Sequence, residues 1–119
     1  GRWMDYNKAD TFGNECIETY SIKAPSSKTT IAEMSGGNQQ KVVIARVFSE
    51  NPKVVICAQP TRGVDIGSIE YIHRRMREFV GTEHAMLLIS ADLEEVKAMS
   101  DRIAVILKER LWQRINRSI

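Results

Sequence analysis

Several residue types that define whole classes of protein are scarce in this sequence. Its 119 residues include two cysteines and three prolines. Cys16 and Cys57 form neither a CxxC pair nor a cluster of metal ligands, and Cys57 lies in an apolar run, where free cysteine packs as a small hydrophobe. No run reaches the ~18 apolar residues of a membrane span, and the first residues lack the pattern of a signal peptide. We therefore expect a cytosolic chain that forms one domain or part of one.

A large excess of one sign of charge is also missing. The formal net charge is +2, with 27% of the residues charged, which is typical of an ordinary solvated surface. Dedicated nucleic-acid binders concentrate basic side chains on one face, so this composition argues against that class. The composition does not indicate any particular partner. We expect both histidines to be solvated, because His73 falls on the polar side of a predicted helix and His84 in a turn before a strand.

What the sequence does contain is an alternation of helical and extended apolar patterns. Apolar positions three and four residues apart predict helices, and short continuous apolar runs predict buried strands. The expected helices cover residues 10–20, a segment between Ser35 and Asn51, residues 69–80, and residues 92–99 with Asp92 and Glu95 as a capping pair. The expected strands cover residues 54–58, 86–89 and 103–107, the first of them buried on both faces. This alternation predicts an α/β fold.

The end of the chain, residues 108–119, differs in kind from what precedes it. Basic side chains interleave there with apolar ones, which fits either a basic amphipathic helix or a frayed, solvated end. The residues concerned are Lys108, Arg110, Leu111, Trp112, Arg114, Ile115 and Arg117.

The most informative stretch is Met-Ser-Gly-Gly-Asn-Gln-Gln-Lys at residues 34–41, where a serine and two glycines open a helix. Glycines let the backbone approach a phosphate closely, and Ser35 offers a hydroxyl donor. The N-terminus of a helix adds unpaired N–H groups and a partial positive charge. The stretch predicts an anion site, although Ser-Gly-Gly alone also fits an ordinary turn before a helix.

The wider context of this motif resembles the ABC ATPase family. The family signature reads Leu-Ser-Gly-Gly followed by Gln or Asn-Gln-Gln, and here Met34 replaces the leucine, a volume-conserving exchange. Residues 60–65, Pro-Thr-Arg-Gly-Val-Asp, look like the D-loop, and residues 100–105 resemble the last passage from helix to strand. The combination is similar to the second nucleotide-binding domain of tandem importers of simple sugars and nucleosides. The resemblance covers residues 21–107.

The resemblance implies the C-terminal part of such a domain, a partial P-loop NTPase fold in which helices cover parallel strands. Residues 1–33 then correspond to part of the helical subdomain and a connector, and residues 34–107 to the signature-to-switch region of the core. Residues 108–119 become an atypical basic tail, because the family normally turns there through a hairpin that contains glycine.

Three departures from the family concern the groups that hydrolyse ATP. The strand that should end in Asp, for Mg²⁺, and Glu, for the attacking water, ends in Ala58 and Gln59. The position of the switch histidine holds Ala91. The loop Gly-x-x-x-x-Gly-Lys-Ser/Thr is absent, so this stretch of sequence cannot wrap the α- and β-phosphates. We therefore predict no catalytic residue and no metal ligand here, and no ATPase activity for the chain alone.

The retained groups belong, by the same resemblance, to a site completed by another domain. It implies that ATP is bound between this chain and a partner nucleotide-binding domain, with Mg²⁺ held only through the partner. The cofactor-binding residues expected on this chain are Ser35, Gly36, Gly37, Asn38, Gln39 and Asp65. Further implied partners are transmembrane permease subunits, with the subunit peripheral on the cytoplasmic, inner face of the cell membrane.

Two other functions stay open at this point. One is a soluble ABC-type ATPase that acts on nucleic acid, although the importer form of the D-loop argues against it and no nucleic-acid partner is expected. The other is a truncated, non-catalytic interaction module. Self-association of the chain is also expected, because removing most of a parallel sheet exposes apolar edges and faces. The sequence leaves open the transported solute, an upstream phosphate loop, and whether residues 108–119 are native to the family.

Overall fold

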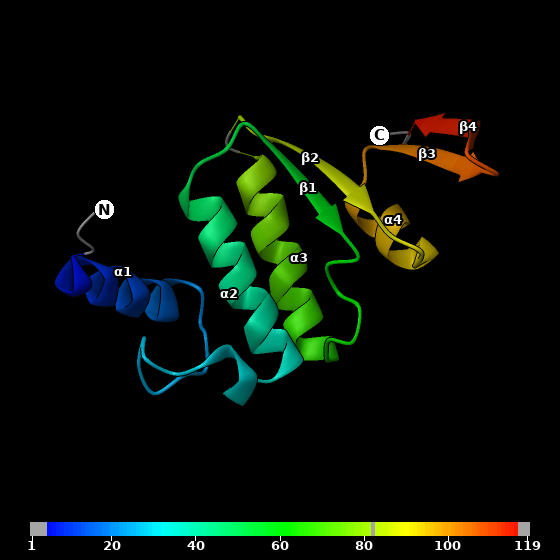
Figure 1. Ribbon diagram of the computed structural model, residues 1–119. Helices are drawn as coiled ribbons and strands as arrows, with labels where there is room; N and C mark the ends of the chain where they lie inside the picture. The colour runs from blue at the N-terminus through cyan, green and yellow to red at the C-terminus, as the bar shows by residue number, and fades with distance from the viewer. Residues whose placement is uncertain (1–4, 82, 117–119) are drawn as a thin grey trace.

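The computed structural model describes residues 5–81 and 83–116, and it confirms the expected alternation of helices and strands (Figure 1). The elements in chain order are α1 (Tyr6–Thr19), the 3-10 turn η1 (Ile31–Glu33), α2 (Gly36–Ser49), β1 (Val54–Ala58), α3 (Ile66–Val80), β2 (Ala85–Ile89), α4 (Leu93–Met99), β3 (Arg102–Leu107) and β4 (Arg110–Asn116). None of the helices within the described residues is long and apolar enough to cross a membrane.

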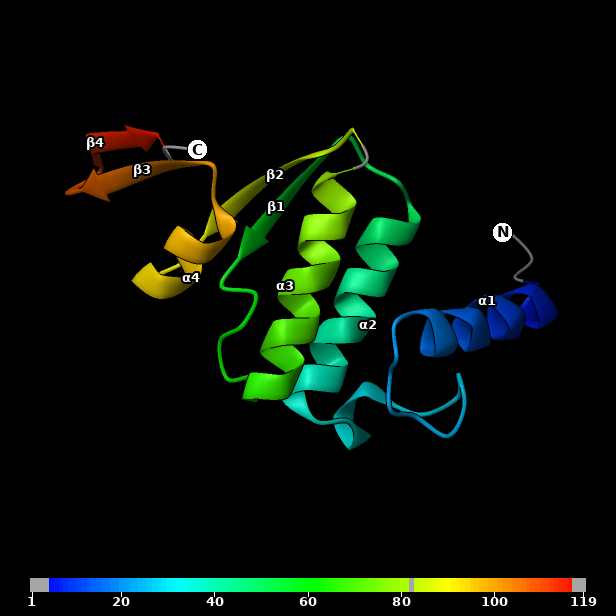
Figure 2. The same cartoon turned by 180° about the vertical axis from the view of Figure 1, so that it is seen from behind.

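The centre of the molecule is a β1–α3–β2 unit with α2 beside α3. Strands β1 and β2 pair in parallel, with Val54 opposite Ala85 and Ala58 opposite Ile89. Helices α2 and α3 lie side by side along this pair of strands in both views (Figures 1 and 2). The buried core consists of residues from α2, α3, β1 and the segment after α1, namely Tyr20, Ile22, Ile44, Ala45, Phe48, Val55, Ile72, Met76 and Phe79. Rings of Phe48 and Phe79 stack at a centroid distance of 4.2 Å and so hold α2 against α3.

The first helix begins earlier than the sequence predicts, at Tyr6 instead of residue 10. Asp5 supplies the reason, because its side chain accepts a hydrogen bond from the amide of Lys8 and so caps the helix. The helix ends where Ser21 adopts a positive φ of 51° and the amide of Ile22 donates back to the carbonyl of Ile17.

The strand at residues 54–58 is covered on one face only, so the expectation of burial on both faces is wrong. Val55 is buried toward the helices, whereas Val54 and Ile56 are 63% and 66% exposed. Leu87 and Ile89 of β2 are exposed in the same way. The reason is architectural, because within the described residues only one layer of helices packs on the β1–β2 pair.

The basic end of the chain forms a strand, neither of the two alternatives predicted for it. Strand β4 pairs antiparallel with β3, from Arg102 opposite Asn116 to Leu107 opposite Arg110, and forms a separate two-stranded sheet. Parallel pairing is therefore confined to β1 and β2 in the described part of the chain. The two-residue turn is made by Lys108 and Glu109, both with positive φ, which is the geometry that fits the twist of a hairpin.

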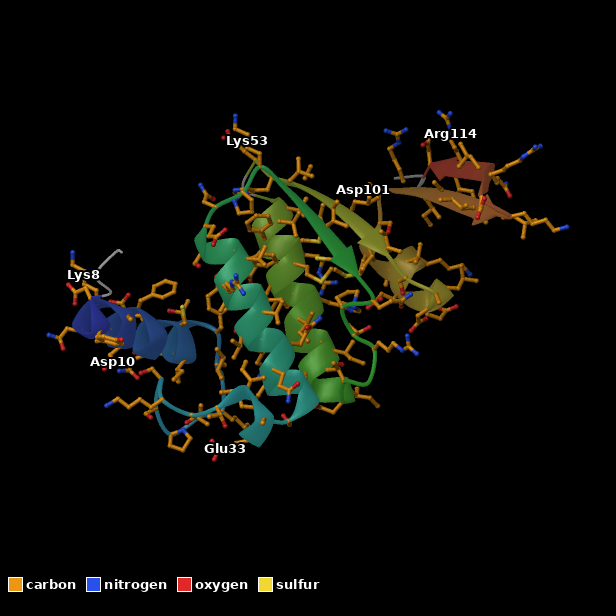
Figure 3. The ribbon with its side chains drawn as sticks, viewed as in Figure 1. Lys8, Asp10, Glu33, Lys53, Asp101 and Arg114 are labelled. Carbon is orange, nitrogen blue, oxygen red and sulfur yellow. The ribbon has the colours of Figure 1, made fainter. Side chains whose placement is uncertain are left out.

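The hairpin lies beyond α4, at the far end of the molecule from α1 (Figure 2). Figure 3 shows Lys8 on α1 and Arg114 on β4 extending away from the ribbon at these opposite ends. Arg117 of the basic end lies outside the described residues. The predicted anion motif lies at one end of the central pair of helices, where α2 begins next to the start of α3 (Figure 1).

Candidate functional site

Ser35 caps the N-terminus of α2, as its position in the sequence predicts. Its Oγ accepts hydrogen bonds from the backbone amide and the side-chain amide of Asn38, at 3.3 and 2.9 Å. Both lone pairs are then used, so the hydroxyl can meet a further group only as a donor. The first amide to bond back within the helix is that of Gln39, to the carbonyl of Ser35. The amides of Gly36 and Gly37 therefore have no acceptor within the helix.

The two glycines of the motif face different surroundings. Gly36 is exposed, and a Cβ added there would lie 3.2 Å from the carbonyl oxygen of Gly63. Gly37 is buried, and a Cβ there would lie 2.7 Å from Cβ of Ser68 and 2.8 Å from Oδ1 of Asp65. No side chain fits at such separations unless the backbone moves. Gly37 is thus required for close contact between α2 and the start of α3.

The amide side chains of Asn38 and Gln39 are engaged inside the chain. Buried Asn38 accepts a hydrogen bond from the amide of Lys23 at 2.7 Å, which ties the connector after α1 to the motif. Gln39 donates to the carbonyls of Ile31 and Met34. These contacts give both side chains a structural role, and their contact with a nucleotide stays a prediction.

Asp65 lies beside Gly37 and caps α3. Its carboxylate accepts from the amide of Ser68 at 3.0 Å. Hydrogen bonds from the side chain and the backbone of Ser68 lower the pKa of Asp65 below its usual range, and nearby Lys41 adds to the effect. The structure therefore brings together Ser35, Gly36, Gly37 and Asp65 at the junction of α2, α3 and residues 60–65, which we call the D-loop segment.

Two residues that follow the predicted site also hold this junction. Gln40 donates from Nε2 to the carbonyl of Pro60 at 2.6 Å and so fastens α2 to the D-loop segment. Lys41 is buried, its Nζ donating to the carbonyl of Ser21 and lying 4.5 Å from the ring centroid of Tyr71. Burial lowers the pKa of Lys41, and repulsion from Lys23 acts in the same direction. Both residues belong to the motif at residues 34–41, but the sequence does not reveal which residues they contact.

The ends of β1 and β2 carry the departures from the family. Gln59 adopts a positive φ of 51°, and its amide donates to the carbonyl of Ile89 at 2.7 Å. Its side-chain Oε1 accepts from the amide of Ala91 at 3.3 Å. The two substituted positions, 59 and 91, are therefore adjacent in space. Neither side chain titrates, and neither can ligate a cation as a carboxylate does.

Both histidines have partners, so the prediction that they are solvated is wrong. His73 Nε2 lies 2.6 Å from Oε2 of Glu95, whose side chain is 3% exposed. His84 stacks on Phe79 at 4.1 Å and lies within hydrogen-bond distance of Asn51 Oδ1. Glu95 serves α4 differently from the prediction too, because Asp92 alone caps the helix and Glu95 turns toward α3. The contacts of His73 with Glu95 and of His84 with Asn51 join residues 22 and 33 positions apart, so no sequence pattern predicts them.

Comparison with known proteins places this geometry in a family. The family model described as ABC transporter matches residues 7–62. The nucleoside import ATP-binding protein NupA of Lactococcus lactis subsp. cremoris is 43% identical over 104 residues, which are 87% of this chain and 21% of that protein. The chain belongs to the ABC transporter family.

Other relatives have related names. The guanosine import ATP-binding protein NupO of Bacillus subtilis is 44% identical over 84% of this chain and 20% of its own length. The ribose import ATP-binding protein RbsA of Bacillus licheniformis is 39% identical over 98% of this chain and 24% of its own length. The chain thus spans about a fifth to a quarter of the length of these ABC transporter relatives.

A solved structure shows that the fold is that of an ABC ATPase cassette. A dimeric ATP-binding cassette in a post-hydrolysis state, bound to ADP and Pi, superposes with a TM-score of 0.79 at 21% identity. The match covers all of this chain and 51% of the cassette. The structure therefore corresponds to a partial P-loop ATPase domain, with the parallel β1–β2 pair covered by helices.

Proposed function

We propose that this chain forms the signature side of an ATP site that it shares with a partner nucleotide-binding domain, in an importer of nucleosides or simple sugars. The observation that carries the proposal is the contrast between the start of α2 and the end of β1. The N-terminus of α2 is capped and held in place, whereas the end of β1 carries Ala58 and Gln59 where a working site needs two carboxylates.

The groups at the start of α2 fit a phosphate. Ser35 has only its hydroxyl proton left to offer, and the amides of Gly36 and Gly37 have no acceptor within the helix. Exposed Gly36 lets an anion approach, and buried Gly37 keeps the helix against Asp65 and Ser68. Bound ATP would supply the phosphoryl group, and these residues would bind and orient it. Mg²⁺ would be held by the partner, because positions 58 and 59 offer no carboxylate.

The names of the relatives support the import role. They are import ATP-binding proteins for nucleosides, guanosine and ribose. A dimeric cassette among the similar structures supports the partner domain. We infer on the same basis that the complete subunit works with permease subunits at the inner face of the cell membrane. Residues 34–107 would then be the signature-to-switch region of the domain, and residues 1–33 part of its helical subdomain and a connector.

The experiment replaces Ser35 in the assembled importer and measures ATP hydrolysis. Ser35→Ala removes the cap and the outward donor, so we expect turnover to fall by about tenfold or more. Ser49→Ala is the matched control, because this serine lies at the other end of α2 and its hydroxyl bonds only locally, to the carbonyl of Arg46. Equal turnover of the two variants would overturn the proposal. So would Mg²⁺-dependent ATP turnover by the chain alone that survives rigorous purification.

A further inference from the structure

The most buried carboxylate among the described residues is that of Glu95, which lies on α4, outside the predicted site. Glu95 is one of three buried polar or charged residues among those described, and its side chain is 3% exposed. A carboxylate removed from water is costly unless hydrogen bonds replace its solvation. Glu95 Oε2 accepts from Thr61 Oγ1 at 2.5 Å and lies 2.6 Å from His73 Nε2. Two strong contacts on one oxygen account for its burial.

The partners of Glu95 come from separate parts of the fold. Thr61 belongs to the D-loop segment and His73 to the middle of α3. Glu95 therefore joins α4 to the D-loop segment and to α3. Of these, only the D-loop segment has no regular structure of its own, so it depends most on such contacts.

The D-loop segment is held at its start by consecutive contacts. The side chain of Gln59 accepts a hydrogen bond from the amide of Ala91, and the carbonyl of Pro60 accepts one from Nε2 of Gln40. The hydroxyl of Thr61 donates to the carboxylate of Glu95. Beyond these points the amide of Arg62 donates to the carbonyl of Gln59, and that of Val64 to the carbonyl of Thr61. The course of the chain toward Gly63 and Asp65, next to the start of α2, is thus set by where residues 59–61 are fixed.

Charge strengthens the contact with Thr61. Burial raises the pKa of Glu95, but hydrogen bonds from Thr61, His73 and Ser90 outweigh it and leave the pKa below the usual range. The carboxylate is therefore ionised at neutral pH. An ionised carboxylate only accepts, so His73 Nε2 carries the proton in this contact, and both bonds are charge-assisted.

We propose that Glu95 is a positioning residue, which holds Thr61 and His73 and thereby fixes the D-loop segment against the start of α2. Its effect on the order of residues 61–65 is independent of any ligand. Its effect on ATP turnover rests on the function proposed above, because only there does the D-loop segment face a nucleotide. The two effects can be measured separately.

The first measurement is amide hydrogen exchange on the complete 119-residue chain. In Glu95→Ala we expect the amides of Arg62 and Val64 to exchange about tenfold faster, because local opening of the segment is no longer opposed. Glu94→Ala is the matched control, since Glu94 is the preceding residue of the same helix and its side chain is 87% exposed. Amides of the β3–β4 hairpin serve as an internal reference and should not change.

A second variant separates positioning from loss of the fold. Thr61→Val keeps the shape of the side chain and removes only the hydroxyl, so it should speed exchange at Arg62 and Val64 while leaving α2 and α3 protected. Glu95→Gln, which keeps an acceptor but not the charge, should fall between Glu95→Ala and the unaltered chain. If Glu94→Ala and Glu95→Ala gave the same exchange, or if Thr61→Val left the segment unchanged, the proposal would be wrong.

The assembled importer gives the second readout. Glu95→Ala should lower kcat for ATP hydrolysis by about tenfold and leave KM for ATP within about twofold, because it misplaces the segment without removing a phosphate ligand. Glu95→Gln should restore part of kcat. Faster exchange without any change in kcat would support the positioning role of Glu95 but count against the shared ATP site. Unchanged exchange with a lowered kcat would refute the positioning role and leave the shared site standing.

Discussion

The start of α2 and the end of β1 lie in one small structure but differ in how they are held. Around the start of α2, buried Asn38 bonds to Lys23 and Ser35, and Gly37 fits against α3 without room for a side chain. At the end of β1, the backbone amide of Gln59 donates to the carbonyl of Ile89 at 2.7 Å, but the side chain of Gln59 makes a single hydrogen bond, of 3.3 Å, with the amide of Ala91. The difference indicates that the start of α2 is preorganised within this chain, whereas positions 58 and 59 at the end of β1 offer no carboxylate.

The largest expected effect compares one substitution at each end in the assembled importer. Gly37→Asp places a Cβ and a carboxylate against Ser68 and Asp65 and next to the proposed phosphate position. Crowding and repulsion between like charges should lower transport and ATP hydrolysis by orders of magnitude. Gln59→Ala alters an end that already lacks both carboxylates, so the same assays should change only slightly. If Gln59→Ala were the more damaging of the two, the comparison would be reversed.

A substitution at the start of α2 should also destabilise the chain alone more than a substitution at the end of β1. Asn38→Ala removes two partly buried hydrogen bonds, one from the amide of Lys23 and one to Oγ of Ser35, which should lower the free energy of unfolding by about 2 kcal/mol. Gln59→Ala removes a single long hydrogen bond and should cost less than about 0.5 kcal/mol. Urea denaturation of both variants, followed by circular dichroism, measures the difference. Equal losses would show that the two ends are equally well held.

The uncovered side of the β1–β2 pair should make the chain self-associate. Ile56 and Leu87 are paired in register and are 66% and 55% exposed, so another copy can bury them. Ile56→Lys should weaken association by about tenfold, close to the loss of one buried apolar side chain. Val43→Lys, at an exposed position of α2, is the control and should change little. A chain that sediments as a monomer over a wide concentration range would contradict this prediction.

The smallest expected effect is a loss of folding stability at acidic pH. Hydrogen bonds lower the pKa of Asp65, and those of Glu95 outweigh its burial. Because both folded values lie below the unfolded ones, these groups stabilise the fold above the ordinary carboxyl range of about pH 4 and lose that contribution as pH falls further. Positions 58, 59 and 91 do not titrate, so the strand end adds nothing to this dependence.

Urea unfolding from pH 7 to pH 3 tests the acid dependence. Glu95→Gln should flatten the loss of stability below about pH 4, since the variant has no carboxyl to protonate at that site. Glu94→Gln, at the exposed neighbouring position, is the control and should keep the slope of the unaltered chain. Parallel curves for Glu95→Gln and the unaltered chain would remove Glu95 from the explanation.

The sequence by itself determined the kind and order of most elements. Apolar spacing, Ser35 before two glycines and Asp92 at the start of α4 are local signals, set by residues three or four positions apart. The helix and strand assignments for residues 36–107 therefore agree with the structure to within a few residues. The motif that resembles the ABC ATPase signature is also a short contiguous stretch, and the comparisons confirm the family.

Only the tertiary structure decided which distant residues meet. Thr61 and Glu95 are 34 positions apart, and Gln40 and Pro60 are 20 apart, so no periodicity links them. One-sided burial of β1 and the packing of Gly37 on α3 depend on which layers are present. The turn at Lys108 and Glu109 lacks glycine, and its two positive φ angles are held by the pairing of β3 with β4. Local preference names the elements, but burial and hydrogen bonding between remote parts of the chain place them.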